Sequence, residues 1–139
     1  MTTIEEALSA YLLGQAAITA MIDQRLYPMN LPQNTPYPAL TYEQVAEAGL
    51  MAHDGPGELV SGRYQFDCCS NDYDRAKLLA REVKRALNGY RGMMSDPSPG
   101  SGQGVNVAGI FFISELDIYE DAAKMFRVSI DFNLMYKEQ

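Results

Sequence analysis

Glu115 and Asp117 are the two side chains whose types and spacing best suit chemistry in this sequence. They lie two residues apart in a segment with strand-like character, so both carboxylates point to the same face. Two carboxylates on one face can hold a hard cation or share the roles of general acid and general base. In the alternative interpretation, which we favour, they form the solvated side of a strand together with the nearby Glu120 and Asp121.

The other candidate motifs lack the context that chemistry requires. His53, the one histidine, lies beside Asp54 in a glycine-flanked segment that predicts a surface loop. Residues 100–104 resemble a phosphate-binding loop, but no strand precedes them and no helix follows. Cys68 and Cys69 are neighbours on a predicted strand and point to opposite faces, which predicts two reduced thiols. We therefore expect no catalytic residue, no metal and no cofactor, and a protein that is not an enzyme.

Length and charge narrow the class of protein further. The chain has 139 residues, of which 47% are hydrophobic, enough for a single domain over 1–139 with one core. No apolar run approaches the roughly 18 residues that a membrane span needs, and the acidic N-terminus lacks the features of a signal peptide. We expect a protein that is cytosolic when made and has no membrane partner. The net charge of −7 argues against specific binding of nucleic acid.

Cations are nevertheless concentrated on one predicted helix. They are either the solvated face of that helix or a stripe that docks an acidic surface. Apolar side chains in two predicted loops are further candidates for contact with a partner. The candidate interface residues are Arg75, Lys77, Arg81 and Arg85 on the helix, and Leu50, Met51, Met93 and Met94 in the loops.

These candidates must be positioned by a sheet built around residues 125–136, where every even position is apolar and the odd positions are mainly polar. Further strands are predicted at about 40–46, 59–69 and 105–119. A helix follows the strand 59–69, and a hairpin at 120–124 joins the strand 105–119 to the strand 125–136. Residues 105–119 are apolar in both phases, which predicts either two covered faces or a bulge near Ser114. The proline-rich connector 25–38 allows at most a short edge strand near Leu26 and Tyr27.

Helices are predicted at 4–13 and 16–22 and, with Asp72 among the capping residues and Gly89 at the end, over about 73–88. Residues 47–58 and 91–104 read as flexible loops. The expected fold is α+β, an antiparallel or mixed sheet of about four to five strands with the long helix and the N-terminal helix pair mainly on one face.

Three blocks of the sequence carry a resemblance to a known family. They comprise residues 7–13, 17–22, 25–28 and 36–42, then 63–68, 73–79 and 87–90, and finally 119–121 and 126–132. In this order they resemble the small tail completion or tail terminator proteins of long-tailed bacteriophages and prophages. The matching positions are mostly core positions, so the resemblance transfers a fold and no site.

The resemblance implies a structural protein that caps the tail tube as a homo-oligomeric ring, commonly a hexamer, and forms the head–tail joining surface. It implies three partners, namely further copies of the chain, the tail tube protein and a head–tail connector or neck protein. It also implies a place in the virion tail, reached after assembly in the cytoplasm of the bacterial host. One alternative is a head-completion or neck connector protein. The other is a small α+β ligand-binding or enzymatic domain that uses the face of Glu115 and Asp117.

Overall fold

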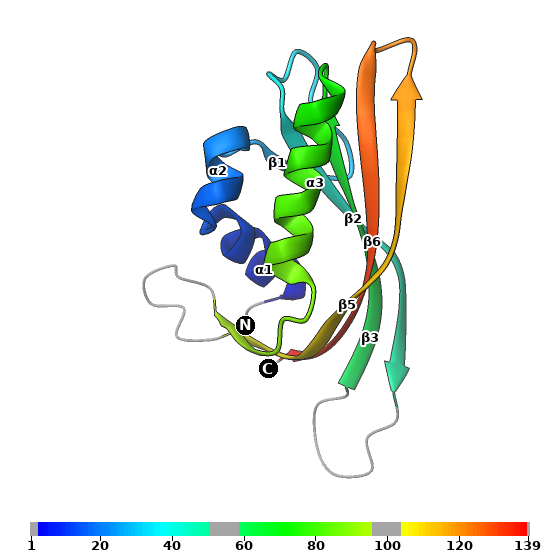
Figure 1. Ribbon diagram of the computed structural model, residues 1–139. Coiled ribbons are helices and arrows are strands. Elements are labelled where there is room, and N and C mark those ends of the chain that lie inside the picture. The colour runs from blue at the N-terminus through cyan, green and yellow to red at the C-terminus, as the bar shows by residue number, and fades with distance from the viewer. Residues whose placement is uncertain (1–2, 51–58, 96–103, 139) are drawn as a thin grey trace.

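The computed structural model describes residues 3–50, 59–95 and 104–138 (Figure 1). Two short helices come first, α1 (Ile4–Leu13) and α2 (Ala16–Ile22), and a longer helix, α3 (Tyr73–Leu87), lies in the middle of the chain. The strands are β1 (Leu26–Pro28), β2 (Ala39–Leu50), β3 (Leu59–Ser70), β4 (Gly92–Ser95), β5 (Gly104–Glu120) and β6 (Met125–Glu138).

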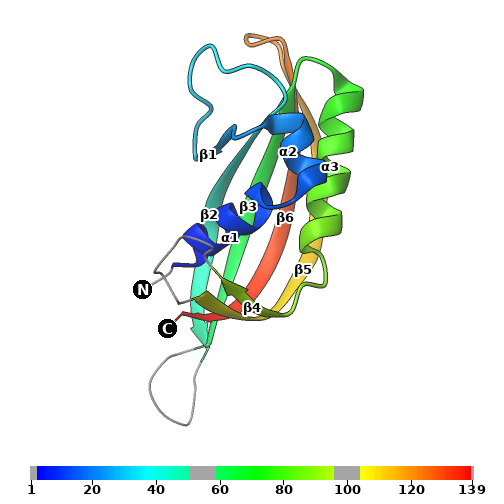
Figure 2. The ribbon, with the colours of Figure 1, turned by 90° about the vertical axis from the view of Figure 1, so that its left-hand side faces the viewer.

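The strands form one six-stranded sheet in the order β1-β2-β3-β6-β5-β4. β1 pairs in parallel with β2, and the other neighbours are antiparallel, so the sheet is mixed. The sheet curls like half a barrel, and the helices lie on its concave side (Figures 1 and 2). The α+β class with helices on one face is confirmed, but the expected count of about four to five strands was too low. β1 confirms the short edge strand that was allowed near Leu26 and Tyr27, and β4 is the strand that was not predicted.

The helix boundaries follow from their caps. The Thr3 hydroxyl accepts a hydrogen bond from the Glu6 amide at the start of α1, as the capping-box spacing predicts. Asp72 does the same for the Asp74 amide at the start of α3. Gly89, with a φ of 85°, turns the chain after α3 into a conformation that a side chain would disfavour. The core between α3 and the sheet is closed on the helix side by buried Ala76, Leu79, Ala80, Val83 and Leu87.

Strand β6 lies at the centre of the sheet, between β3 and β5. Its apolar side chains point to the helices and are buried, which confirms the alternation predicted for 125–136; they are Val128, Ile130, Phe132, Leu134 and Tyr136. Its polar side chains lie on the convex face. Ser129 differs from the expectation of a wet position, because it is 7% exposed and donates a hydrogen bond to Asp67.

The two segments predicted as flexible loops include residues that form strands. Residues 47–50 belong to β2, where the ladder runs out to the pair Leu50 and Leu59. Residues 92–95 form β4, which pairs with Gly104–Val107 at the start of β5. Glycines and methionines in these segments carry little strand signal, and pairing with a neighbouring strand decides their conformation. The remaining loop positions, 51–58 and 96–103, lie outside the described residues, and with them Met51, His53 and the glycine-rich stretch.

Strand β5 is interrupted twice by register shifts, between Val107 and Gly109 and between Phe112 and Ser114. The second shift confirms the bulge predicted near Ser114. Before this shift Ile110 and Phe112 lie opposite the core residues Leu134 and Phe132, and after it Glu115 and Asp117 take the helix side. Leu116 and Ile118 are thereby turned to the convex face, opposite Ser129 and Arg127. Among the helices that the structure describes, none has the length and apolar character needed to cross a membrane.

Candidate interaction surfaces

The carboxylates of Glu115 and Asp117 share a face, as predicted, but it is the face that carries α3. Lys84 Nζ lies 2.7 Å from Glu115 Oε1, and Lys77 Nζ lies 3.1 Å from Asp117 Oδ1. Lys77 also contacts Glu115, and the Tyr73 hydroxyl donates to Asp117 at 2.7 Å. The interpretation as a simply solvated pair is therefore wrong for Glu115, which is largely covered and held between two lysines.

The electrostatics of this cluster favour the charged forms. Burial would raise the pKa of Glu115, but hydrogen bonds from Lys77 and Lys84 outweigh it and the pKa is lowered. Hydrogen bonds from Tyr73 and then from Lys77 lower the pKa of Asp117. The hydrogen bond to Glu115 raises the pKa of Lys77. These hydrogen bonds and ion pairs join β5 to α3.

Within the described part of the chain, no three side chains of His, Cys, Asp or Glu come together as possible metal ligands.

The cations predicted as a docking stripe divide into two sets. Lys77 is used internally, as described above. Arg75 and Arg81 are exposed and form no ion pair with any residue that the structure describes, while Arg85 makes only a 3.6 Å contact with Glu82. The arginines are thus the members of the set that remain available to a partner.

The apolar candidate interface residues differ in exposure. Met93 is 49% exposed, whereas Met94 is buried in the core, so the expectation that Met94 is exposed was wrong. Alternation along β4 explains the difference, because neighbouring residues on a strand point to opposite faces. Leu50 is the last residue of β2, and its side chain, like Met51, lies outside the description.

The main exposed apolar surface was missed by the sequence reasoning and lies on β5. Its members are between 37% and 61% exposed; they are Phe111, Phe112, Ile113, Leu116, Ile118 and Tyr119. Phe111, Leu116 and Ile118 lie on the convex face, whereas Phe112 and Tyr119 lie on the helix side, near the uncovered edge of the strand. The signal was present, because a strand that is apolar in both phases needs a cover on both faces. The helices cover one face only.

The backbone of β5 has a free edge beside this surface. β4 covers only its first residues. Both backbone groups of Ile110 bond to the turn after α3, and the Asn88 side chain accepts a hydrogen bond from the Phe112 amide. From residue 113 to residue 120, the backbone groups that point away from β6 have no partner within the described ranges. An apolar edge of this kind is a site for pairing with another strand.

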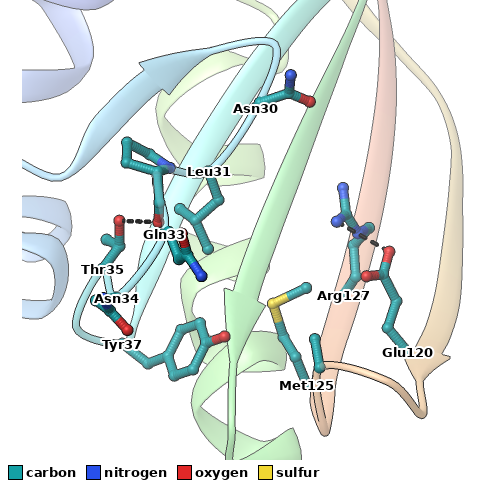
Figure 3. Close-up of a pocket in the computed structure, with 11 residues that line it drawn as sticks. Asn30, Leu31, Gln33, Asn34, Thr35, Tyr37, Glu120, Met125 and Arg127 are labelled. Carbon is teal, nitrogen blue, oxygen red and sulfur yellow. Dashed lines mark hydrogen bonds and ion pairs between the residues drawn. The ribbon is translucent and has the colours of Figure 1, made fainter.

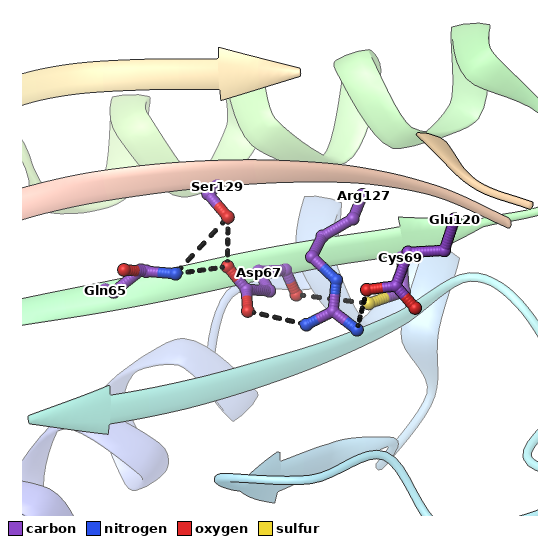
Figure 4. A network of polar contacts seen from close by, with 6 residues as sticks. All are labelled: Gln65, Asp67, Cys69, Glu120, Arg127 and Ser129. Carbon is purple, nitrogen blue, oxygen red and sulfur yellow. Dashed lines mark hydrogen bonds and ion pairs between the residues drawn. The ribbon is translucent and has the colours of Figure 1, made fainter. Parts of the chain in front are cut away.

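The convex face of the sheet carries a polar network (Figure 4). Asp67 is 5% exposed and accepts hydrogen bonds from Arg127 at 2.9 Å, from Gln65 at 3.1 Å and from Ser129. A second nitrogen of Arg127 lies 2.9 Å from Glu120. Beside them, burial raises the pKa of the Cys69 thiol to about 11, so this cysteine stays protonated and unreactive at neutral pH. The network joins β3, β6 and β5 and is structural.

A cavity of about 860 Å³ opens next to this network, between the connector 30–37 and the β5–β6 hairpin (Figure 3). Asn30, Gln33 and Tyr37 line it from the connector, and Arg127 and Glu120 from the sheet. The two charged groups are paired with each other at 2.9 Å. The cavity is lined mainly by polar side chains.

Comparisons with known proteins agree with a structural role. A search of curated proteins finds no match. Among solved structures, a chain of the virion of a native gene transfer agent (GTA) particle has a similar fold, with a TM-score of 0.72 over 96% of this chain and 94% of that chain at 18% sequence identity. Residues 6–137 match the family described as tail completion protein gp17. Because this match spans nearly the whole chain, the protein belongs to the tail completion protein gp17 family.

Proposed function

We propose that this protein completes the phage-type tail by capping the tail tube as a ring of identical copies. The observation that carries the proposal is the family match over residues 6–137. In this role the protein stops growth of the tube and presents the surface that joins the tail to the head. Its partners are the tail tube protein on one side of the ring and a head–tail connector or neck protein on the other, and the number of copies is six.

The surfaces described above suit such a role. A ring needs two different patches on each subunit that fit one another. This chain has an open apolar edge on β5 beside the exposed Arg81, and elsewhere the elements α1, α2 and β2, which contain no lysine or arginine. The carboxylates that suggested chemistry are bound by lysines instead. We therefore place the protein in the virion tail, after assembly in the host cytoplasm, and assign it no reaction.

The test is deletion of the gene in a phage or particle that encodes it, with the wild-type gene supplied in trans as the control. A tail terminator predicts tails of irregular length that do not join to heads, both seen by electron microscopy. Tails of normal length that fail only in joining would instead support the alternative, a head-completion or neck connector protein. Normal infectious particles would contradict both.

A further inference from the structure

Among the residues that the structure describes, two edge segments of the sheet are open, and they belong to different strands. One is the segment 113–120 of β5 described above. The other is β2 beyond Tyr42, because β1 pairs only with Leu40–Tyr42 and Met29 bonds the Tyr42 carbonyl. From Glu43 onward, the outer backbone groups of β2 have no partner among the described residues. Each segment is long enough for an ordinary strand pairing.

The β5 edge lacks the usual protection against pairing. Segment 113–120 contains neither lysine nor proline, the residues that commonly guard an edge. Its carboxylates at Glu115 and Asp117 are neutralised by α3. Its apolar side chains stay exposed, with Leu116 at 61%. An edge left in this state suits a partner strand.

We propose that the open edge of β5 pairs with the open edge of β2 in a second copy of the chain, so that the sheet continues from one subunit to the next. The inference rests on the proposed ring and names the surfaces that build it. β2 is antiparallel to β3, β3 to β6 and β6 to β5, so β5 and β2 run in opposite directions. Copies placed side by side in the same orientation therefore bring antiparallel edges together, the more stable arrangement.

Charge complementarity indicates that the partner strand at the open β5 edge comes from a second copy of the chain. Arg81 lies one helical turn from both Lys77 and Lys84, on the flank of α3 toward β5. By contrast, α1, α2 and β2 contain no lysine or arginine, and β2 carries Glu43 and Glu47. Glu47 lies on the helix side of the sheet, where it accepts a hydrogen bond from Tyr136.

A continuous sheet keeps the helices of all copies on one side. Arg81 of one copy then faces the acidic β2 side of the next. A symmetric pair of two β5 edges would instead bring two cationic helices together.

The two open segments also lie at different positions along the strand direction. The open part of β5 ends at the β5–β6 hairpin, and the open part of β2 leads toward β3 at the opposite end of the sheet (Figure 1). Pairing them shifts each copy along the strand direction relative to its neighbour. Such a stagger tilts the strands relative to the axis of a closed assembly. The contact is heterologous, the type that generates rings when the rotation closes.

The experiment places a lysine on each edge in turn. Leu116→Lys changes the β5 edge and Val45→Lys, at a residue 48% exposed, changes the β2 edge; Leu78→Lys on the outer side of α3 is the control. Self-association of the purified chain is measured by sedimentation velocity, and thermal melts check folding. We expect the two edge variants to melt like the wild type but to associate at least tenfold more weakly, while Leu78→Lys associates normally.

Mixing the two edge variants gives the decisive measurement. Each retains the edge that the other has lost, so an equimolar mixture should form a dimer with one good contact and grow no further. If Val45→Lys still associates with itself and Leu116→Lys does not, the contact is a symmetric β5 pair and the assignment of β2 is overturned. Normal association of Leu116→Lys, or a wild type that stays monomeric at every concentration, overturns the inference entirely. The gene deletion tests the tail role independently, so that role can stand when this inference fails.

Discussion

Among single residues, Phe132 shows how strongly one side chain of β6 supports the core. It is fully buried, packs edge-to-face against Phe66 and Phe112, and lies opposite Tyr64 in the ladder. Phe132→Ala should lower the free energy of unfolding by about 3–5 kcal/mol, from lost burial and the cavity left behind. Urea denaturation at a concentration where the chain is dispersed measures this loss.

The neighbouring Asn133 provides the control for that change. It lies on the convex face, where it accepts a 3.0 Å hydrogen bond from Ser61. Asn133→Ala should cost less than about 1.5 kcal/mol, the typical net value of one hydrogen bond. Equal losses for the two variants would contradict the orientation of β6.

Arg127 supports stability for a different reason. Its guanidinium neutralises Asp67, a carboxylate that is 5% exposed. Arg127→Ala leaves that charge buried without its cation and should cost about 3 kcal/mol. Arg63→Ala, which breaks a 2.6 Å pair with Asp131 whose arginine is 46% exposed, should cost less than about 1 kcal/mol.

A double-mutant cycle separates the pair from its surroundings. If the Arg127→Ala variant is destabilised because the Asp67 charge is left buried without a cation, removing that charge should recover part of the loss. The double variant Asp67→Asn/Arg127→Ala should then lose less free energy of unfolding than the two single variants together. Strict additivity in chemical denaturation would show that the two side chains do not act as a pair.

Between elements, the contact of β5 with α3 depends on Glu115. Its lowered pKa means that the folded state binds the proton less tightly than the unfolded chain does. The stabilisation is therefore complete above its ordinary pKa of 4.5 and is lost as the pH falls through the lower folded value. Glu115→Gln should cost about 1–2 kcal/mol at neutral pH, because the side chain is only partly exposed and meets two lysines. Denaturation curves across pH 3–7 should show this difference between variant and wild type shrinking at the acidic end.

Glu82→Gln is the matched control for this measurement. Glu82 contacts Arg85 at 3.6 Å, and that arginine is 71% exposed. The change should cost no more than about 0.5 kcal/mol, with little pH dependence. A difference between Glu115→Gln and wild type that stayed constant down to pH 3 would rule out the ion pairs as its source.

The elements also show what the sequence could predict. Alternation located β6 and β3, and cap residues located α1 and α3, because these signals are local in the chain. β4 and the C-terminal end of β2 were missed because their conformation is decided by pairing with a neighbouring strand. The surface on β5 was missed for a related reason. Its convex-face residues, such as Leu116 and Ile118, have the apolar character of core residues, and only the placement of all helices on the other side reveals that no helix covers them.

In the whole molecule, the uneven distribution of charge becomes meaningful once the sheet is seen to have two open edges. The net charge of −7 is carried in part by a side that lacks cations, formed by α1, α2 and β2. The exposed Arg81 of α3 lies near the other edge, that of β5. A chain whose two sides are complementary in charge is suited to head-to-tail assembly.

This distribution leads to a prediction about Arg81. Arg81→Glu should leave the melting temperature of the subunit nearly unchanged, because the residue is exposed and unpaired within the described chain. It should raise the dissociation constant between copies about tenfold, which corresponds to about 1.4 kcal/mol. Sedimentation at two salt concentrations measures both the loss and its electrostatic origin, since screening should reduce the effect at high salt.

Arg75→Glu provides the control for this last change, because the helical repeat places Arg75 on the other flank of α3, away from β5. It changes the net charge by the same amount and should leave association intact. Adding Glu47→Arg to Arg81→Glu in the same chain should recover part of the lost association, since a heterologous contact then pairs the reversed charges across subunits. If Arg75→Glu weakened assembly as much as Arg81→Glu, overall charge would explain the effect and the flank facing β5 would have no special role.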